Sequence, residues 1–318
     1  MKIIFWGKGN RGLSCLHALL EKGHNIDLVV GHPEKKGQWY GSVVESARKE
    51  GLKTLLPEDP NAPEVERALK ARTPDLFILG GYGKILKQNI IEIPKLMTIN
   101  LHAGKLSKYR GSSPLNWALI NGEPSFTLSV IKVDAGVDTG DILAERTFPI
   151  SPDNTIRDLH KTADQQFPLM LLEVLARIEK GECIPQPQNK DEASYYPLRF
   201  PEDGFILWDT CTAEQVHNRV RALTDPYPCA FTFFKGRKVK LLSSELYNFE
   251  YYGEPGRVYI KSAKRGLLVC AQDKCLWITE AVFEDSGEPL FEEIKRYDKL
   301  LTVRDSILQT QLSQSVSS

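Results

Sequence analysis

An amide and an imidazole stand two positions apart at the end of an apolar run. The run covers residues 96–101, and Asn100-Leu101-His102 closes it. Side chains alternate along a strand, so Asn100 and His102 are expected on one face. Open α/β sheets bind their ligands at the carboxyl ends of parallel strands. An amide can donate to a developing oxyanion and an imidazole can accept a proton near neutral pH, so the pair indicates a catalytic site. A purely structural end of a strand is the alternative.

A loop rich in acids and glycines follows about thirty-six residues after His102. It reads Asp134-Ala-Gly136-Val-Asp138-Thr-Gly140-Asp141. A tight loop here would bring a carboxylate back towards the imidazole. A calcium-binding loop would need regularly spaced oxygen ligands and a glutamate at its twelfth position, and this segment lacks them. A plain acidic turn remains the second interpretation.

The first apolar run is followed directly by the pattern G-x-G-x-x-G, written Gly7-Lys-Gly9-Asn-Arg-Gly12. Such a turn at the start of a helix lets the backbone approach a phosphate closely. A nicotinamide dinucleotide site would also need an acid at the end of the second strand. That strand ends at His32, and Asp27 lies at its beginning. The pattern therefore favours a tight first turn over a dinucleotide site. At most, the turn would contact an anionic ligand.

Composition restricts the class of protein. A chain of 318 residues has the length of about two domains, and 42% hydrophobic with 26% charged residues is typical of a soluble globular protein. Forty-one basic residues balance forty-one acidic ones, which gives no general attraction to nucleic acid or membranes. No membrane span or signal peptide is expected. Six scattered cysteines without C-x-x-C are expected to be reduced and to bind no metal. A cytoplasmic location without membrane contact is predicted.

The first half of the chain alternates apolar runs with helical patterns. This order predicts an α/β domain with a Rossmann-like, doubly wound, mostly parallel sheet. The expected strands cover 2–6, 26–31, 75–80, 96–101 and 126–133, and the expected helices cover 12–22, 42–50 and 63–72. A longer helix over 155–180 is expected to pack on the sheet and to kink near Pro168. The stretch 108–117, with its glycine and proline, is not expected to form a strand.

The second half has a different pattern. A polar, proline-bearing stretch precedes one helix at 212–223 and short β-runs at 230–234, 239–242, 257–260, 267–271 and 275–279. Short turns between these runs predict a small antiparallel OB-like β-barrel. We therefore expect an N-terminal domain over 1–184, a linker over 185–202, a barrel domain over 203–308 and a flexible tail over 309–318.

Three motifs together resemble the signature of the 10-formyltetrahydrofolate-dependent formyltransferases, and the resemblance covers nearly the whole chain. They are Asn100-Leu-His102, Lys108-Tyr-Arg-Gly-x-x-Pro-Leu-Asn-Trp117 and Asp134-x-Gly-x-Asp-Thr-Gly-Asp141. Within that family the chain looks most similar to the UDP-4-amino-4-deoxyarabinose formyltransferase, partly through Trp39-Tyr-Gly-Ser-Val43. One departure stands out. The family usually has Ser-Leu-Leu-Pro after its histidine, where this chain has Ala103-Gly-Lys-Leu-Ser107.

The resemblance implies a role for several residues. The catalytic residues would be Asn100, His102 and Asp138. The folate co-substrate would contact Tyr82, Gly83, Lys84, Ile85, Leu86, Asp134 and Asp141. The second substrate would contact Gly9, Tyr109, Arg110, Ser113 and Pro114. A homodimer is a further expectation from the family.

Formyl transfer is an acyl transfer in which an amine attacks the formyl carbon directly. Negative charge develops on the formyl oxygen, and Asn100 has amide hydrogens to stabilise it. The amine must lose a proton, which His102 can accept. Asp138 would either orient the imidazole or receive the proton itself, and the sequence leaves these two roles open. The reaction needs no metal and no covalent intermediate.

The amine acceptor is left open between two classes. A methionyl-tRNA formyltransferase would carry a longer basic insert after the second strand, but residues 32–40 are few and hold two lysines and one acid. Residues 235–265 contain eight basic and three acidic side chains, as a nucleic-acid-binding barrel would, whereas 266–305 contain five basic and nine acidic ones. The balance favours a nucleotide-linked amino sugar over initiator methionyl-tRNA. A formyltetrahydrofolate hydrolase and a non-catalytic folate-binding regulator are the remaining alternatives.

Overall fold

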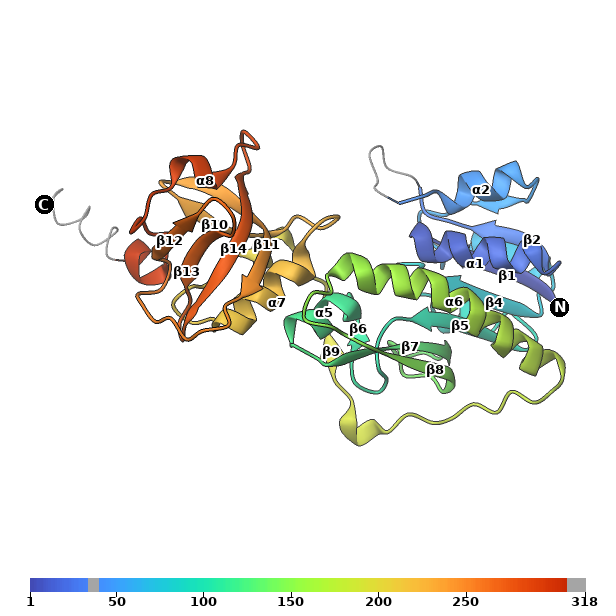
Figure 1. Cartoon of the computed structure of the whole chain (residues 1–318). Helices are drawn as coiled ribbons and strands as arrows, with labels where there is room; N and C mark the ends of the chain where they lie inside the picture. The colour runs from blue at the N-terminus through green and yellow to red at the C-terminus, as the bar shows by residue number, and fades with distance from the viewer. Residues whose placement is uncertain (34–39, 308–318) are drawn as a thin grey trace, which may run out of the picture. The chain divides into compact units, whose positions relative to one another are not determined.

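A seven-stranded sheet forms the centre of the first compact unit (Figure 1). The computed structural model describes residues 1–33 and 40–307, and this unit comprises Met1–Pro114, Ser125–Ile150 and Leu159–Pro197. The strand order is β3-β2-β1-β4-β5-β7-β8. Their bounds are β1 Lys2–Gly7, β2 Asn25–Val30, β3 Thr54–Leu55, β4 Leu76–Gly80, β5 Met97–His102, β7 Ser125–Lys132 and β8 Ile142–Pro149. The first five strands are parallel and β7 is antiparallel to both neighbours, so the predicted mostly parallel α/β sheet is confirmed.

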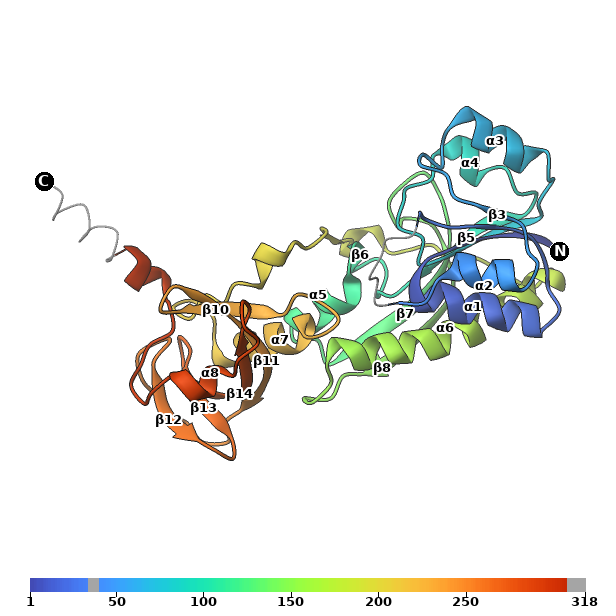
Figure 2. The same cartoon turned by 90° about the horizontal axis from the view of Figure 1, so that it is seen from above.

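Helices cover both faces of this sheet, which explains why its central strands β1 and β4 are almost wholly apolar. Ile3, Ile4, Phe5 and Trp6 of β1 have no exposed surface. In Figure 2 one face carries α1 (Gly9–Glu21), α2 (Val43–Lys49) and α6 (Ile156–Glu179), and the other carries α3 (Pro63–Lys70) and α4 (Gln88–Ile91). Helix α6 continues through Pro168 and buries the predicted apolar stripe.

The glycines of the first turn have packing roles. Gly9 has a φ of +69°, a conformation that favours glycine. A Cβ on Gly12 would lie 2.6 Å from the carbonyl oxygen of Gly80 in β4. The third glycine therefore lets α1 lie directly against β4, and the G-x-G-x-x-G pattern is explained without a dinucleotide.

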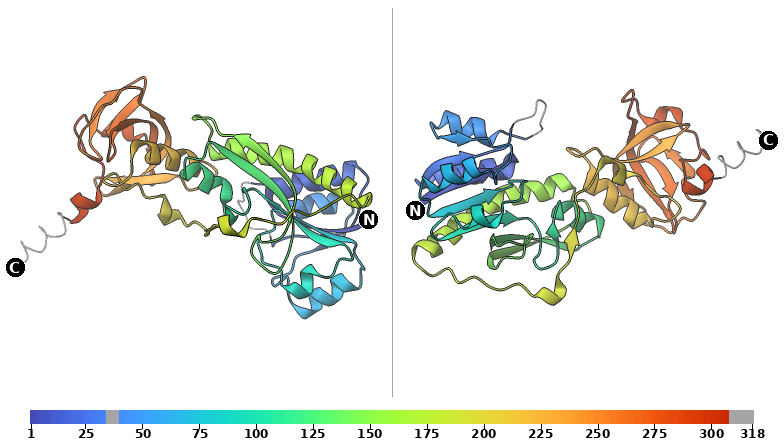
Figure 3. Two further views of the ribbon diagram at one scale, coloured as in Figure 1. Left: turned by 90° about the horizontal axis from the view of Figure 1, so that it is seen from below. Right: turned by 180° about the vertical axis from the view of Figure 1, so that it is seen from behind.

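After α6 the chain runs back past β7 and β8, and we call residues 185–197 the return segment (Figures 1 and 3). Gln186 exchanges two backbone hydrogen bonds with Ile142. Strand β9 (Tyr195–Tyr196) pairs in parallel with β6 (Arg110–Gly111), and a short 3₁₀ turn, η1 (Lys190–Glu192), lies between. The expectation of no strand within 108–117 is therefore wrong for two residues, because a partner 85 positions away pairs with them.

The second compact unit comprises Leu115–Pro124, Ser151–Asp158 and the chain from Leu198. Its antiparallel sheet has the order β10-β11-β14-β13-β12, with β10 Ala230–Phe234, β11 Arg237–Leu246, β12 Val258–Ser262, β13 Gly266–Cys270 and β14 Cys275–Phe283. Figure 3 shows these strands in orange. The predicted antiparallel sheet is confirmed. The unit also has α5 (Pro114–Ile120), η2 (Pro201–Gly204), α7 (Ala213–Leu223) and α8 (Leu290–Glu293).

Residues near the end of this unit connect the two edge strands of its sheet. Val258 at the start of β12 donates its N–H to Asp298, and Leu301 donates its N–H to Phe233 of β10. Thus the short stretch 298–301 is hydrogen-bonded to both edges. Helix α7 begins at a capping box in which Thr212 and Gln215 satisfy each other's backbone N–H groups.

The cysteines differ from the prediction. Cys270 and Cys275 face each other in the register of β13 and β14 and form a disulfide, so the expectation that all six are reduced is wrong for this pair. Spacing alone could not show it, because the pairing follows from the hairpin register. Cys15, Cys183, Cys211 and Cys229 are free.

Within residues 1–33 and 40–307, no helix is both long enough and apolar enough to cross a membrane. The predicted tail over 309–318 lies outside the described residues. So do residues 34–39, which form most of the short segment compared above with the basic insert.

Candidate active site

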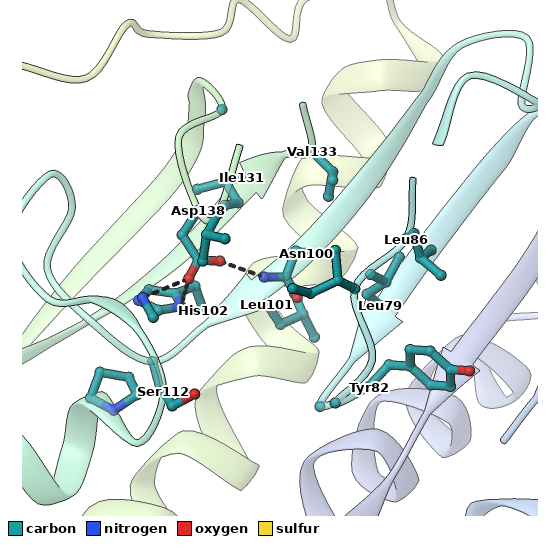
Figure 4. Close-up of a pocket in the computed structure, with 18 of the residues that line it drawn as sticks. Leu79, Tyr82, Leu86, Asn100, Leu101, His102, Ser112, Ile131, Val133 and Asp138 are labelled. Atoms are coloured by element: carbon teal, nitrogen blue, oxygen red, sulfur yellow. Dashed lines mark hydrogen bonds and ion pairs between the residues drawn. The ribbon is translucent and has the colours of Figure 1, made fainter. Parts of the chain in front are cut away.

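The side chain of Asp138 lies between those of Asn100 and His102 (Figure 4). Asn100 Nδ2 donates to Asp138 Oδ1 over 3.3 Å, and His102 Nδ1 lies 3.4 Å from Asp138 Oδ2. The backbone N–H of Gly111 donates to the same Oδ2 over 2.9 Å. The His102 and Asp138 side chains are only 6% and 14% exposed. Three segments distant in the sequence therefore meet at one nearly buried carboxylate.

The other nitrogen of His102 is held by the backbone. Nε2 lies 2.7 Å from the carbonyl oxygen of Tyr109. A carbonyl only accepts, so this network assigns a proton to Nε2. In the neutral imidazole, Nδ1 is then the nitrogen that can accept a proton, and it is the one that faces Asp138.

Asn100, His102 and Asp138 line a cavity of about 430 Å³. Its apolar lining includes Leu79, Leu86, Leu101, Ile131, Val133 and Val137, and other residues of the 134–140 loop line it too. This mixture suits a flat heteroaromatic ring with polar edges. Arg11 from α1 also lines the cavity, and its guanidinium lies 3.5 Å from the carbonyl oxygen of Leu101.

Most residues expected to contact folate line this cavity. They are Tyr82, Gly83, Lys84, Ile85, Leu86 and Asp134. The Lys84 ammonium donates to the carbonyls of Pro57 and Glu58, whereas Ile85 is 74% exposed at the rim. Asp134 accepts hydrogen bonds from Gly136 N and Thr139 Oγ1, so it shapes the loop. Asp141 is not among the lining residues, and its carbonyl accepts from Lys132 in the sheet.

The residues expected to contact the second substrate are distributed. Ser113 and Pro114 line the 430 Å³ cavity, and Gly9 lines a second cavity of about 330 Å³ at the first turn. Tyr109 and Arg110 line neither of them. The Tyr109 ring stacks on Tyr196 at 4.7 Å, and Arg110 is 5% exposed, with its guanidinium bonded to Gln188. Their side chains are held by contacts with residues 188–196 instead.

Some residues at the site were not predicted. Gly104 stands in the segment where the chain departs from its family, and a Cβ there would lie 2.7 Å from His102 Nε2. Only a glycine fits beside this imidazole. Gln188 and the backbone of Gly111 also contact Asp138. The departure from the family motif was a usable signal for Gly104, but nothing in the sequence pattern pointed to Gln188.

His32 connects the end of β2 to the loop that follows β4. Its ring stacks on Tyr82 at 4.3 Å, and its Nε2 accepts the backbone N–H of Gly83 over 3.1 Å. Burial, with the nearby charges of Lys8 and Lys84, lowers the pKa of His32 to about 4. The imidazole is therefore neutral near pH 7 and free to accept this bond. It also lines the second cavity.

The sequence and the fold agree with one family. The family model described as "Formyl transferase" matches residues 1–175, and "Formyl transferase, C-terminal domain" matches residues 200–289. The chain belongs to the formyltransferase family. It is a formyltransferase, and 10-formyltetrahydrofolate is the formyl donor of the family, as the catalytic motifs implied.

A methionyl-tRNA formyltransferase from Acetivibrio thermocellus is 35% identical over 92% of this chain and 95% of its own length. Two solved structures share the fold. The N-formyltransferase from Helicobacter canadensis, solved with folinic acid and dTDP-3-aminofucose, has a TM-score of 0.69 at 20% identity and covers 87% of this chain and 98% of its own. HypX from Aquifex aeolicus with tetrahydrofolic acid has a TM-score of 0.63 at 21% identity, and the similarity covers 89% of this chain and 44% of HypX.

Replacing Gly104 with alanine is expected to displace His102. The new Cβ would lie 2.7 Å from His102 Nε2 and 2.8 Å from the Tyr109 carbonyl oxygen. A shift of the imidazole by about 1 Å typically costs about 10²-fold in rate, so kcat should fall by that order. Lys161→Ala, an exposed position on α6 away from the cavity residues, is the control. Equal kcat values for the two variants would contradict this role of Gly104.

The neutral state of His32 predicts a pH dependence of stability. Its pKa in the folded chain is about 4, below the ordinary value of 6.5. Between these values the unfolded chain binds the proton more readily, so the stabilisation present above pH 6.5 is lost as the pH falls towards 4. Denaturant unfolding from pH 7 to 4 should show a steeper decrease for the wild type than for His32→Gln. Parallel profiles would show that His32 is not the group responsible.

Proposed function

We propose that Asn100, His102 and Asp138 catalyse transfer of the formyl group from 10-formyltetrahydrofolate to a primary amine. The observation that carries this proposal is the position of Asp138, with one oxygen on Asn100 and the other on His102. These are the polar groups that acyl transfer to an amine requires: a donor for the developing oxyanion, and a proton acceptor supported by a charge.

Each residue has a distinct role in this proposal. Asn100 donates one amide hydrogen to Asp138, and its second amide hydrogen is the candidate donor to the formyl oxygen. The Nδ1 atom of His102 and the facing Oδ2 of Asp138 together take the proton of the attacking amine, since Nε2 is committed to Tyr109. As the bond between the formyl carbon and N10 of the folate breaks, this proton passes to N10, which leaves as the amine of tetrahydrofolate. The carboxylate stabilises the imidazolium that forms. Folate occupies the 430 Å³ cavity, against the apolar wall that contains Leu79 and Leu86.

The acceptor we propose is the methionyl amine of initiator tRNA. Support comes from the relative in Acetivibrio thermocellus, which matches along both units of the chain. This reverses the order in which sequence patterns alone rank the acceptors. We also propose that the C-terminal sheet closes as an OB-like barrel, supported by the hydrogen bonds of residues 298–301 to both edge strands.

A nucleotide-linked amino sugar is the second candidate, and one observation favours it. Five of the eight basic side chains between 235 and 265 are paired with carboxylates; they are Lys235, Arg237, Lys238, Lys240 and Arg265. Four of their partners, among them Glu284 and Glu293, come from the acidic stretch 266–305. Such pairs reduce the positive field that a tRNA would meet, although exposed pairs are weak and exchangeable.

Removing any member of the catalytic group is expected to slow transfer without unfolding the chain. Asn100→Ala should lower kcat by about 10²–10³-fold, as loss of an oxyanion donor does. His102→Ala and Asp138→Asn should lower it by about 10²–10⁴-fold, because the proton acceptor is lost or loses its charge. Rapid-quench assays with circular dichroism as the folding control measure this. Near-normal transfer by any of the three would refute the assignment.

The acceptor is identified by giving the enzyme both classes of amine. With 10-formyltetrahydrofolate as donor, charged initiator tRNA should be formylated, and UDP- and dTDP-linked amino sugars should not. Binding of the tRNA should weaken steeply with salt, with a log–log slope of about −0.9 per phosphate contacted in duplex regions. Formylation of an amino sugar, with no turnover of the tRNA, would establish the second candidate instead.

A further inference from the structure

Gln188 is a buried side chain in an otherwise polar and exposed part of the chain. It lies in the return segment and is 8% exposed, whereas Gln186 two positions earlier is exposed. A buried amide must find partners for both its oxygen and its nitrogen. The partners of Gln188 are the backbone of the catalytic loop and the guanidinium of Arg110.

Both polar atoms of the Gln188 amide are hydrogen-bonded: Oε1 accepts two bonds and Nε2 donates two. Arg110 donates to Oε1 through Nε over 3.0 Å and through Nη2 over 2.7 Å. Nε2 of Gln188 donates to the carbonyl oxygens of Asp138 over 2.8 Å and Gly140 over 2.7 Å. Only one orientation of the amide satisfies these partners, because a guanidinium only donates and a carbonyl only accepts.

The hydrogen bonds from Gln188 reach the backbone at Asp138, which has an unfavourable conformation. Asp138 has a φ of +52°, in the left-handed region that side-chain-bearing residues rarely adopt. A Cβ on Gly140 would overlap the carbonyl oxygen of Lys132, so the loop is tightly packed on its other side. The backbone of Asp138 is thus held by Gln188, while its carboxylate is held by Asn100 and Gly111.

Arg110 links the hydrogen bonds of Gln188 to the second segment that meets Asp138, the one that contains Gly111. It is 5% exposed, and its Nη1 donates to the Tyr195 hydroxyl over 3.0 Å. Its own N–H donates to the Ser194 carbonyl, so the return segment holds both its backbone and its side chain. The next residue, Gly111, donates to the Asp138 carboxylate. One buried guanidinium–amide pair therefore connects the two loops that meet at Asp138.

We propose that Gln188, held by Arg110, is a positioning residue that fixes the Asp138 carboxylate against His102. The inference rests on the proposed role of Asp138. Gln188 touches no reacting atom in this proposal, and no proton or bond passes through it. Its amide sets the direction of the Asp138 peptide, and so the place from which the carboxylate reaches Nδ1 of His102.

Gln188→Glu distinguishes the two sets of hydrogen bonds that the amide makes, those accepted from Arg110 and those donated to the loop. A carboxylate keeps the acceptors for Arg110 but cannot donate to the carbonyls of Asp138 and Gly140. Gln188→Met keeps the approximate shape and removes both sets of bonds. Gln186→Glu is the matched control on the same segment, because the contacts of Gln186 with Ile142 are made by its backbone. Each variant is assayed with 10-formyltetrahydrofolate and with methionyl-tRNA or the amino sugar, whichever the wild type formylates.

Both Gln188 variants are expected to lose about 10²-fold in kcat, as a misplaced catalytic group does, with a much smaller change in the KM for the donor. The ¹⁵N and ¹H NMR signals of the His102 imidazole in the free enzyme should shift in both. Gln186→Glu should resemble the wild type in every measurement. The NMR readout does not depend on turnover, and it separates displacement of the carboxylate from simple loss of folded protein.

Wild-type kcat in the two folded Gln188 variants, or unchanged His102 signals, would overturn the proposal. Asp138→Asn is measured beside them. If it is inactive while the Gln188 variants are fully active, only the inference fails. If Asp138→Asn is fully active, the proposed function fails, whatever the Gln188 variants do.

Discussion

The carboxylate of Asp138 is the group on which the candidate site depends. A carboxylate withdrawn from water needs donors or positive charge to compensate its lost hydration. Asn100 and Gly111 supply donors, and the imidazole of His102 faces the second oxygen. These groups come from a strand end and two loops, so burial of one charge brings together the parts of the reaction. Displacing any one of them leaves another polar group without its partner.

Much of the first unit follows from local pattern. Buried parallel strands are continuous apolar runs, and their order with helices predicts the sheet. Alternation along β5 placed Asn100 and His102 on one face, where both meet Asp138. The strand over 126–133 was predicted, but its reversed direction as β7, the strand β8 and the role of Gln188 could not be, because they depend on pairing between distant segments. The Cys270–Cys275 pair was missed for the same reason, since register decides which residues face each other.

The chemistry and the choice of amine depend on different parts of the molecule. Oxyanion stabilisation and proton removal are the same for any primary amine, so the proposed roles of Asn100, His102 and Asp138 alone do not select one. Other residues must contribute to selection, and the second unit contains several paired charges, such as Arg237 with Asp285. In the proposal above, the relative from Acetivibrio thermocellus supports tRNA as the acceptor, and the charge pattern supports a smaller acceptor.

The return segment, residues 185–197, lies beyond the part of the chain that the first family model matches. The first family model stops at residue 175, inside the long helix α6. A fragment cut at that point would keep Asn100, His102 and Asp138, but it would lose β9 and the amide that holds the aspartate peptide. The span of the first family model is therefore shorter than the segment that contains the proposed positioning residue. The first compact unit itself extends to Pro197.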